Sequence, residues 1–394
     1  VPGTLTVTLQ RLTNMAAQGW WDGDNHFHMN YAGVYFNTPQ RLLEQAEAED
    51  IHVLNNLICN KEQRIPDVAH FRGAPDPVST ATRILYHNQE YHPPFWGHST
   101  FLNLKQHLVI PDYVGYRNTV VASLFPSNTT PFQVTRAQGG LAGYAHGAGP
   151  HFPVDLALDN VDFAEANTAA GMEPLYRAWN CGYRVVASAG EDAFPNFYRS
   201  YILGTNRVYV KTGTKLDYDR WHADFRAGRS FVTNGPLVLF RLNGQEPGGE
   251  IKLGAGRHTL QAVVEVHSIT PVESIEVLHN GKVVATRKGE SRLAQEIPVD
   301  ASGWLAVRVT ARYGRHPLRA PQPFAATMPV WVTVDGKPVR SKPDAEYFVQ
   351  WMDRTLERAL AQTAWNNDQE RQEIRKLYGE ARSRMMARGA EATR

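Results

Sequence analysis

A histidine pair near the start of the chain is the feature best suited to chemistry. The segment Asp24-Asn25-His26-Phe27-His28 lies in an aromatic stretch with the pattern of a strand. Because successive side chains of a strand point to opposite faces, Asp24, His26 and His28 are expected on one face, with the imidazoles about 7 Å apart. Neutral imidazole is the commonest metal ligand in proteins. The spacing predicts one edge of a metal site, although His-x-His also occurs in ordinary packing.

Further histidines and carboxylates follow in four separate segments, and ten of the fifteen histidines lie before residue 152. The candidate ligands lie in residues 89–98, 139–146, 165–167 and 189–192. Each segment alone is weak evidence. If these segments end neighbouring strands, their side chains meet at one edge, where a bridging carboxylate can hold two cations about 3.5–4 Å apart.

The elements needed to position these residues can be predicted. Thr38 and Pro39 have the pattern of an N-cap and a first helical position, and this helix should run to about Asp50. Residues 51–54 are expected to form the next strand. Apolar runs at residues 140–145, 161–166 and 184–189 fit further short buried strands. Residues 20–235 therefore predict an α/β unit of alternating strands and helices.

The pattern changes after Thr233-Asn234-Gly235-Pro236. Alternating strands follow, and Asn280-Gly281 and Asp335-Gly336 are pairs typical of tight hairpin turns. Residues 236–341 are therefore predicted to form a β-sandwich after the first unit.

The two ends of the chain complete the domain prediction. Residues 1–19 are an N-terminal segment, and residues 342–394 have helical spacing. The first C-terminal helix should pack on the body. The second is highly charged and is expected to be solvated or to face a partner, so these helices could support an oligomer.

Composition narrows the function classes. The chain has 394 residues and a net charge of +2, which gives no argument for nucleic acid or a membrane surface. The expected partner is a small-molecule substrate. Because the chain begins at Val1, a removed leader or upstream domain and a periplasmic or secreted location are plausible expectations. Cys59 and Cys181 are too few for a disulfide framework and are interpreted as small buried apolar residues.

In their order, these motifs resemble the polymerase-and-histidinol-phosphatase (PHP) superfamily of metallohydrolases, and most closely its carbaryl-hydrolase-like CehA/McbA branch. The resemblance covers about residues 20–339. It is carried by residues 23–31, 60–67, 89–92, 96–98, 180–184, 187–192 and 233–236. It implies a distorted (β/α)7 barrel of PHP type, with its metals at the C-terminal mouth.

The resemblance also implies two metals that share Glu90. The implied ligands are His26, His28, Glu90 and Asp192 for the first metal, and His98, His146 and the bridging Glu90 for the second. Zn²⁺ is expected in both sites, with Mn²⁺ or Fe²⁺ as alternatives, because mixed histidine and carboxylate sites suit all three. Residues 57–60 depart from the Thr-Asp-His of the superfamily, and Phe194 replaces its last histidine. A third metal site is therefore expected to be absent.

The remaining candidates are predicted around the metals. His151, in a loop near the mouth, is a candidate proton donor, with an ordinary surface histidine as the alternative. Glu165 ends a predicted strand and is a second catalytic candidate. The predicted substrate-pocket residues are Asp24, Tyr31, Lys61, Arg64, His92 and Asn167. Asp24 could instead orient a histidine, and the residues around Lys61 could form an ion-pair cluster.

The leading functional hypothesis is a metal-dependent hydrolase, in which a metal-activated hydroxide attacks the substrate. The resemblance implies cleavage of a carbamate or an aryl ester. Phosphoester hydrolysis is the alternative within the enzyme class. A binding or scaffold protein that keeps a structural metal is the alternative outside it. Metal content and turnover would separate these hypotheses.

Overall fold

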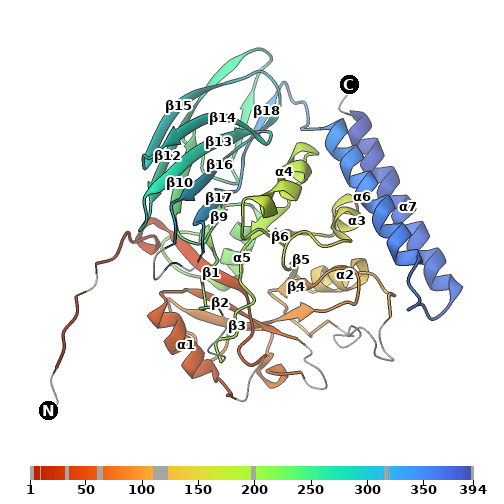
Figure 1. Cartoon of the computed structure of the whole chain (residues 1–394), viewed down its shortest axis with the longest axis horizontal. Coiled ribbons are helices and arrows are strands. Elements are labelled where there is room, and N and C mark those ends of the chain that lie inside the picture. Colours follow the sequence, from red (N-terminus) through yellow and green to blue (C-terminus); the bar gives the residue numbers. More distant parts are fainter. Residues whose placement is uncertain are drawn as a thin grey trace.

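A computed structural model describes residues 4–8, 10–31, 35–59, 65–109, 123–196, 201–314, 318 and 320–391. The fold is mixed α/β with a pair of helices at the C-terminus, as the sequence predicted in outline (Figure 1). Among the described residues, no helix combines the length and the apolar character needed to cross a membrane.

Seven strands surround the candidate site. They are β1 (Trp20–Phe27), β2 (Val53–Ile58), β3 (Ile84–Tyr91), β4 (Ser99–Leu102), β5 (Leu141–Tyr144), β6 (Phe163–Glu165) and β7 (Val186–Ser188). Neighbours in this row are parallel except β4, which is antiparallel to β3 and β5. After β7 the chain returns to β1, because Asn25 donates its backbone N–H to the carbonyl of Ala189 and Phe27 bridges Ala193. The last segment of the row therefore contacts the first strand.

Short helices connect several of these strands. They are α1 (Pro39–Ala48), α2 (Thr129–Ala137), α3 (Phe152–Ala157) and α4 (Glu173–Asn180), and α5 (Tyr218–Arg226) follows β8 (Arg207–Lys211). The predicted start of α1 is confirmed, since the Thr38 side chain accepts a hydrogen bond from the backbone N–H of Arg41. The buried side chains of α1 are Leu42, Leu43 and Ala46. Their spacing turns one face of the helix toward the core.

The main sheet continues beyond residue 235. β8 pairs with β1, β9 (Ser230–Thr233) pairs with β8, and β17 (Phe324–Thr327) pairs with β9. The sheet then runs through β16 (Gly303–Ala311) and β18 (Val330–Val334) to β11 (Glu250–Leu253). β13 (Val272–His279) pairs with β16, and β14 (Lys282–Lys288) pairs with β13. A three-stranded sheet of β10 (Leu237–Leu242), β12 (His258–His267) and β15 (Arg292–Val299) accompanies it. Apolar side chains of both sheets share one buried core.

The two predicted hairpin turns have different outcomes. Asn280 and Gly281 have φ of 50° and 81° and join β13 to β14, as predicted. Asp335 and Gly336 also have positive φ, but the described chain then leads to a helix, so the second hairpin is wrong. Turn residues set only local geometry, and Pro338 has no N–H to give to a following strand.

The C-terminal helices are α6 (Lys342–Leu360) and α7 (Asp368–Ala390), which lie side by side (Figure 1). The predicted cap of α7 is confirmed, because the Asn367 side chain accepts from the N–H of Glu370 at 3.0 Å. The expectation of a solvated second helix fails for one face, on which Ile374, Tyr378, Ala381 and Met385 are buried. These apolar residues recur at helical spacing, but the many charged residues between them made the pattern difficult to recognise in the sequence. Oligomerisation through the outer face stays a prediction.

Candidate metal centre

Glu90, at the carboxyl end of β3, lies between the other candidate ligands. Its side chain is about 1% exposed. On one side, its Oε1 is 3.4 Å from His26 Nε2, 3.3 Å from His98 Nδ1 and 3.6 Å from His146 Nε2. The side chains of His98 and His146 are 44% and 46% exposed, so this side of the carboxylate opens to solvent.

The other oxygen of Glu90 faces a second set of side chains. Its Oε2 is 2.9 Å from His28 Nε2 and 2.7 Å from His92 Nε2. Asp192 completes the group, with Oδ1 3.1 Å from His28 Nε2 and 3.6 Å from His26 Nε2. The structure therefore brings together all six side chains that the sequence predicted as metal ligands, although they come from separate segments.

Local backbone features produce this convergence. A bulge between Asp24 and Phe27 interrupts the register of β1 beside the histidine pair. His146 and Asp192 follow the ends of their strands with φ of 60° and 52°, a conformation that costs energy for residues other than glycine. Gly190 is required by space, because a Cβ there would lie 2.3 Å from the Cβ of His26. The backbone therefore departs from regular strand geometry close to several of the candidate ligands.

Two acceptors hold the histidine pair in one tautomer. Glu165 Oε1 lies 2.7 Å from His26 Nδ1, and the carbonyl of Leu57 lies 2.7 Å from His28 Nδ1. Each Nδ1 therefore donates its proton outward, which leaves each Nε2 directed toward Glu90 as the atom that would ligate a cation. Glu165 also accepts the backbone N–H of His146 at 2.7 Å, so this predicted catalytic residue contacts the ligands and positions them.

The Nε2 atoms of His26 and His28 and Oε1 of Glu90 are buried and have no hydrogen-bond partner among the described residues. Other buried polar atoms of the described chain also have no partner, but these three lie together, where one cation could satisfy them. Burial opposes charge on His26, but the carboxylates of Glu165 and Glu90 outweigh it and raise the pKa of His26 well above its usual value. Burial likewise opposes charge on Glu90, yet His92 and His26 hold its pKa well below the usual range. The donor set fits a divalent cation.

Several predicted pocket residues lie at this centre. The Tyr31 ring is 4.9 Å from the His28 ring and stacks on Phe194 at 4.8 Å. Asn167 donates its amide N–H to the carbonyl of Gly190 and so holds the loop before Asp192. His92 contacts Glu90 directly. Lys61 and Arg64 fall outside the described residues.

Asp24 does not enter the pocket. Its carboxylate accepts the backbone N–H of His26 at 3.0 Å and that of Gly204 at 2.8 Å, and it is fully buried. Burial raises the pKa of Asp24 to about 7. The alternative of orienting a histidine fits this position, since the carboxylate fixes the backbone of His26.

His151 lies in a different place from the one predicted for a proton donor. It is fully buried, with Nδ1 2.9 Å from the hydroxyl of Tyr378 and Nε2 3.0 Å from the hydroxyl of Thr129. Thr129 and Tyr144 both donate to Asp155. His151 Nε2–H must then donate to Thr129, and Nδ1 must accept from Tyr378. Burial lowers the pKa of His151 to about 3. A neutral, fully hydrogen-bonded imidazole beneath α7 has no proton to offer a substrate.

His70, Asp76 and His87 form another group with metal-ligand atoms within 4.8 Å of one another. Here the hydrogen bonds decide against a cation. The side-chain oxygen of Asn56 accepts the backbone N–H of Met29. The side-chain NH₂ of Asn56 must therefore be the donor to His87 Nδ1. His87 Nε2–H then donates to Asp76 at 3.0 Å. A metal at Nε2 would require an imidazolate, so we interpret this group as structural.

Sequence analysis missed one contact of the centre. Cys59 Sγ lies 3.5 Å from His28 Nδ1, and Cys59 also lies near Glu90 and His92. Its position directly after the last residue of β2 was the available signal, because the carboxyl ends of parallel strands meet at one edge of a sheet.

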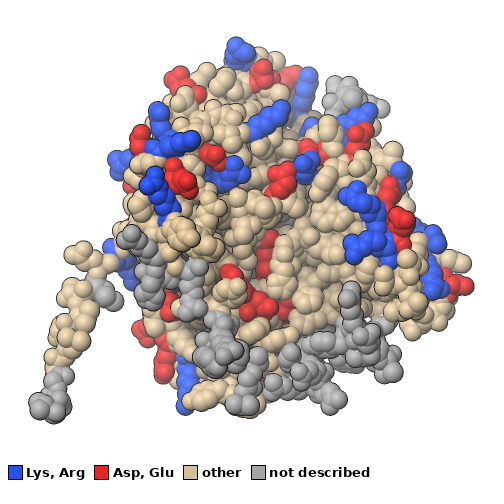
Figure 2. Space-filling model, viewed as in Figure 1, with Lys and Arg blue, Asp and Glu red and all other residues tan. Residues whose placement is uncertain are grey.

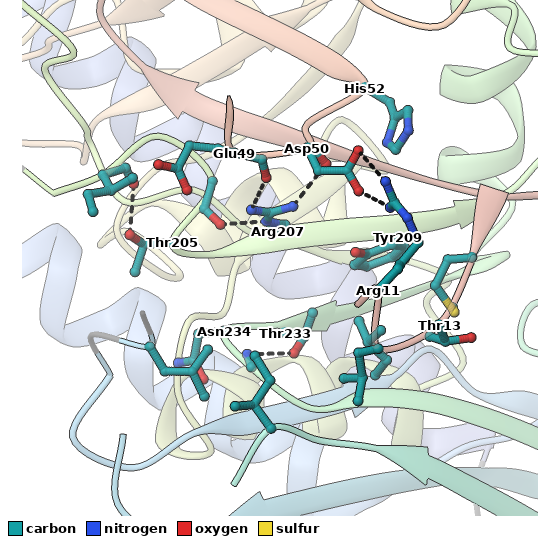
Figure 3. A pocket seen from close by; sticks show the side chains of 18 of the residues that line it. Arg11, Thr13, Glu49, Asp50, His52, Thr205, Arg207, Tyr209, Thr233 and Asn234 are labelled. Atoms are coloured by element: carbon teal, nitrogen blue, oxygen red, sulfur yellow. Dashed lines mark hydrogen bonds and ion pairs between the residues drawn. The ribbon is translucent and has the colours of Figure 1, made fainter. Parts of the chain in front are cut away.

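Two cavities run along the junction of the seven strands with the β-sheets beyond residue 235. The larger, of about 490 Å³, is lined by Arg11, Asp50 and Arg207 among others (Figure 3). Its main charges are paired, Arg11 with Asp50 and Arg207 with Asp22. We therefore assign it no chemistry, despite its size.

The second cavity has a volume of about 390 Å³. Asn167 and Glu191 line one side, and Glu191 directly precedes Asp192. Phe324 of β17 lies on its wall, and the two cavities share Thr205 and Asn234. On the face drawn in Figure 2, acidic side chains gather in a central hollow, whereas lysine and arginine lie mainly around its edge and over the C-terminal helices.

Comparison with known proteins gives only weak likenesses. No family model and no curated protein matches the chain. PsfC from Pseudomonas syringae PB-5123 is 12% identical over 53% of this chain and 90% of its own, with a TM-score of 0.35. An Endonuclease Q complex with a 27-mer duplex containing an abasic lesion is 16% identical over 53% of this chain and 56% of its own, also with a TM-score of 0.35. These similarities are too low to assign a family or an activity.

Proposed function

We propose that the chain is a metal-dependent hydrolase that would hold two divalent cations sharing Glu90 as a ligand, with zinc as the expected ion. One observation carries the proposal. Buried imidazole and carboxylate atoms face one another without hydrogen-bond partners among the described residues, at the carboxyl ends of several strands. Leaving such atoms without a partner costs about 1–3 kcal/mol each. A cation bound among them would remove that cost.

The side chains of the protein would position the cations and the substrate at this site, and the cations would act as Lewis acids. Divalent cations bound there would lower the pKa of a coordinated water and polarise the substrate carbonyl. His26 and His28 are held in the tautomer that ligates through Nε2. His98 and His146 are half exposed, so the Oε1 side of Glu90 can admit water and substrate. Catalytic metal sites keep an open position, whereas structural sites are closed.

We propose an aryl carbamate or aryl ester as the substrate. Tyr31 and Phe194 form a stacked pair beside His28, which suits a flat apolar group. The cavity of about 390 Å³ beside Glu191 has room for a small ester or carbamate. Hydrolysis would add water across the carbonyl–oxygen bond and release an aryl alcohol. The carbamate preference rests on the motif resemblance alone.

The proposal is tested by elemental analysis of the purified full chain, paired with a screen of naphthyl carbamates, aryl esters and nitrophenyl phosphates. The expected result is between one and two equivalents of zinc, manganese or iron, with hydrolysis of carbamates or esters that stops on chelation and returns with metal. Preferential cleavage of the phosphates would replace the carbonyl assignment with a phosphoesterase. Bound metal without hydrolysis of any activated substrate would favour a scaffold with a structural metal.

A further inference from the structure

Two ligand-type side chains on the buried side of Glu90, Cys59 and His92, are not among the ligands proposed for the two cations above. Cys59 directly follows β2, and His92 directly follows β3. One ligand atom of each of Cys59, Glu90 and His92 lies within 4.8 Å of the other two. All three residues are buried, with exposed fractions of 2%, 1% and 7%. A sulfur, an oxygen and a nitrogen therefore converge in a region shielded from water.

The two sides of Glu90 differ in solvent access. The histidines at Oε1 are half exposed, as an open catalytic position requires. At Oε2, His92 Nε2 approaches to 2.7 Å and the Cys59 thiol lies close by. A buried position with a sulfur ligand has the character of a closed metal site. The two sides therefore differ both in ligand type and in access to water.

The contacts of Cys59 favour a thiolate ligand. His28 Nδ1–H donates mainly to the carbonyl of Leu57 at 2.7 Å, and the sulfur lies 3.5 Å from the same nitrogen. The positive end of that N–H therefore lies near the sulfur, where it would stabilise negative charge. Neighbouring donors of this kind support metal ligands in proteins.

The geometry points to a third cation position, held by Cys59 Sγ, His92 Nε2 and Glu90 Oε2, that takes a thiophilic divalent ion such as zinc. Thiolate and imidazole ligands prefer zinc, cobalt and cadmium over magnesium, calcium and manganese. This position does not rest on the proposed hydrolysis, because it needs only the three ligands.

Cys59, Glu90 and His92 differ from the group of His70, Asp76 and His87, which we interpreted as structural. In the latter group, the side-chain carbonyl of Asn56 accepts the backbone N–H of Met29. The ring of His87 is fixed with its Nε2 proton toward Asp76. In the new position, His92 needs to supply only Nε2, which lies 2.7 Å from Glu90 Oε2. The same nitrogen is the one that would bind the cation.

The test uses the full-length protein, stripped of metal and titrated with cobalt chloride. A cobalt ion bound to a thiolate has a strong near-ultraviolet charge-transfer band, which oxygen and nitrogen ligands do not produce. The chain has two cysteines, and the second provides a matched control. Cys181 is equally buried but lies by the C-terminal helices, 3.7 Å from the carbonyl of Ser341. The variants are therefore Cys59→Ser and Cys181→Ser.

The wild type and Cys181→Ser are expected to develop the band, and Cys59→Ser is expected to lose it while still binding cobalt through the remaining ligands. His92→Ala should require more cobalt to reach the same band. Persistence of the band in Cys59→Ser, its loss in Cys181→Ser, or an unchanged cobalt requirement in His92→Ala would overturn the assignment.

X-ray absorption of the cobalt-loaded wild type provides a readout that needs no variant. A sulfur neighbour of cobalt is expected, and a shell of oxygen and nitrogen alone would refute the site even if a variant failed to fold. Neither measurement depends on substrate turnover. The third position can therefore fail while the hydrolase proposal stands, and the reverse also holds.

Discussion

The Glu90 cluster and the network around His151 are both buried and both combine histidine with a carboxylate, but only the second is closed by hydrogen bonds. Each polar atom in the path from Tyr378 through His151 and Thr129 to Asp155 has a partner. At Glu90, imidazole and carboxylate atoms meet without one among the described residues. Residue types alone do not separate a structural cluster from a binding site. The two are separated by the direction in which each group donates its proton.

The largest expected effect comes from removing the carboxylate that the metal ligands share. Since outer changes at metal sites cost about 10–100-fold, Glu90→Ala should lower cation affinity and hydrolysis by more than about 100-fold. Calorimetric titration with zinc and the rate of ester cleavage measure this, with circular dichroism as the folding control. If a folded variant bound zinc as tightly as wild type, the claim that the Glu90 cluster binds metal, unlike the His151 network, would be wrong.

A smaller loss is expected for the residue that only holds a ligand. Glu165→Gln keeps the size of the side chain but weakens the acceptor for the Nδ1–H of His26. Zinc affinity should fall by about 10–100-fold with the number of bound ions unchanged. Titration of the two proteins side by side checks this. A change in stoichiometry would show that Glu165 is a ligand itself.

The closed network should respond to pH in its stability. Burial raises the pKa of Asp155 from 3.8 to about 7, so the folded state keeps a proton that the unfolded state loses. The free energy of unfolding should therefore fall as pH rises from about 4 to about 7, by a few kcal/mol at most. Asp155→Asn should show a shallower decline in urea unfolding over this range. An identical slope in both proteins would contradict the assignment.

The smallest effect is expected where the C-terminal helices contact this network. Tyr378→Phe removes the hydroxyl that donates to His151 and should cost about 1–2 kcal/mol of stability. Zinc content and turnover should not change, because both ring nitrogens of His151 bond within the network. Thermal unfolding and metal analysis on the same sample test both parts. Loss of turnover without loss of stability would restore His151 as a catalytic candidate.

The six candidate ligands were proposed from the sequence mainly through the motif resemblance, and the structure brings their side chains together. Their role as metal ligands stays a prediction. Thr38, Asn280 and Asn367 were predictable directly, since capping and tight turns depend on neighbouring residues. His151 was misplaced because its environment is built by α7, which is more than 200 residues away in the chain.

The contacts of Cys59 also escaped sequence reasoning. Its neighbour His92 follows a different strand, and the two come together only because β2 and β3 pair in parallel. The buried face of α7 was hidden by the charges around it. Long-range packing therefore decided the cases in which local pattern gave the wrong answer.

Anomalous diffraction from crystals of the zinc-loaded protein tests the central claim most directly. The account predicts zinc peaks beside the Glu90 carboxylate, one among His26, His28 and Asp192 and the other beside His98 and His146. A map with no peak at Glu90, or with zinc bound only at other residues, would contradict it.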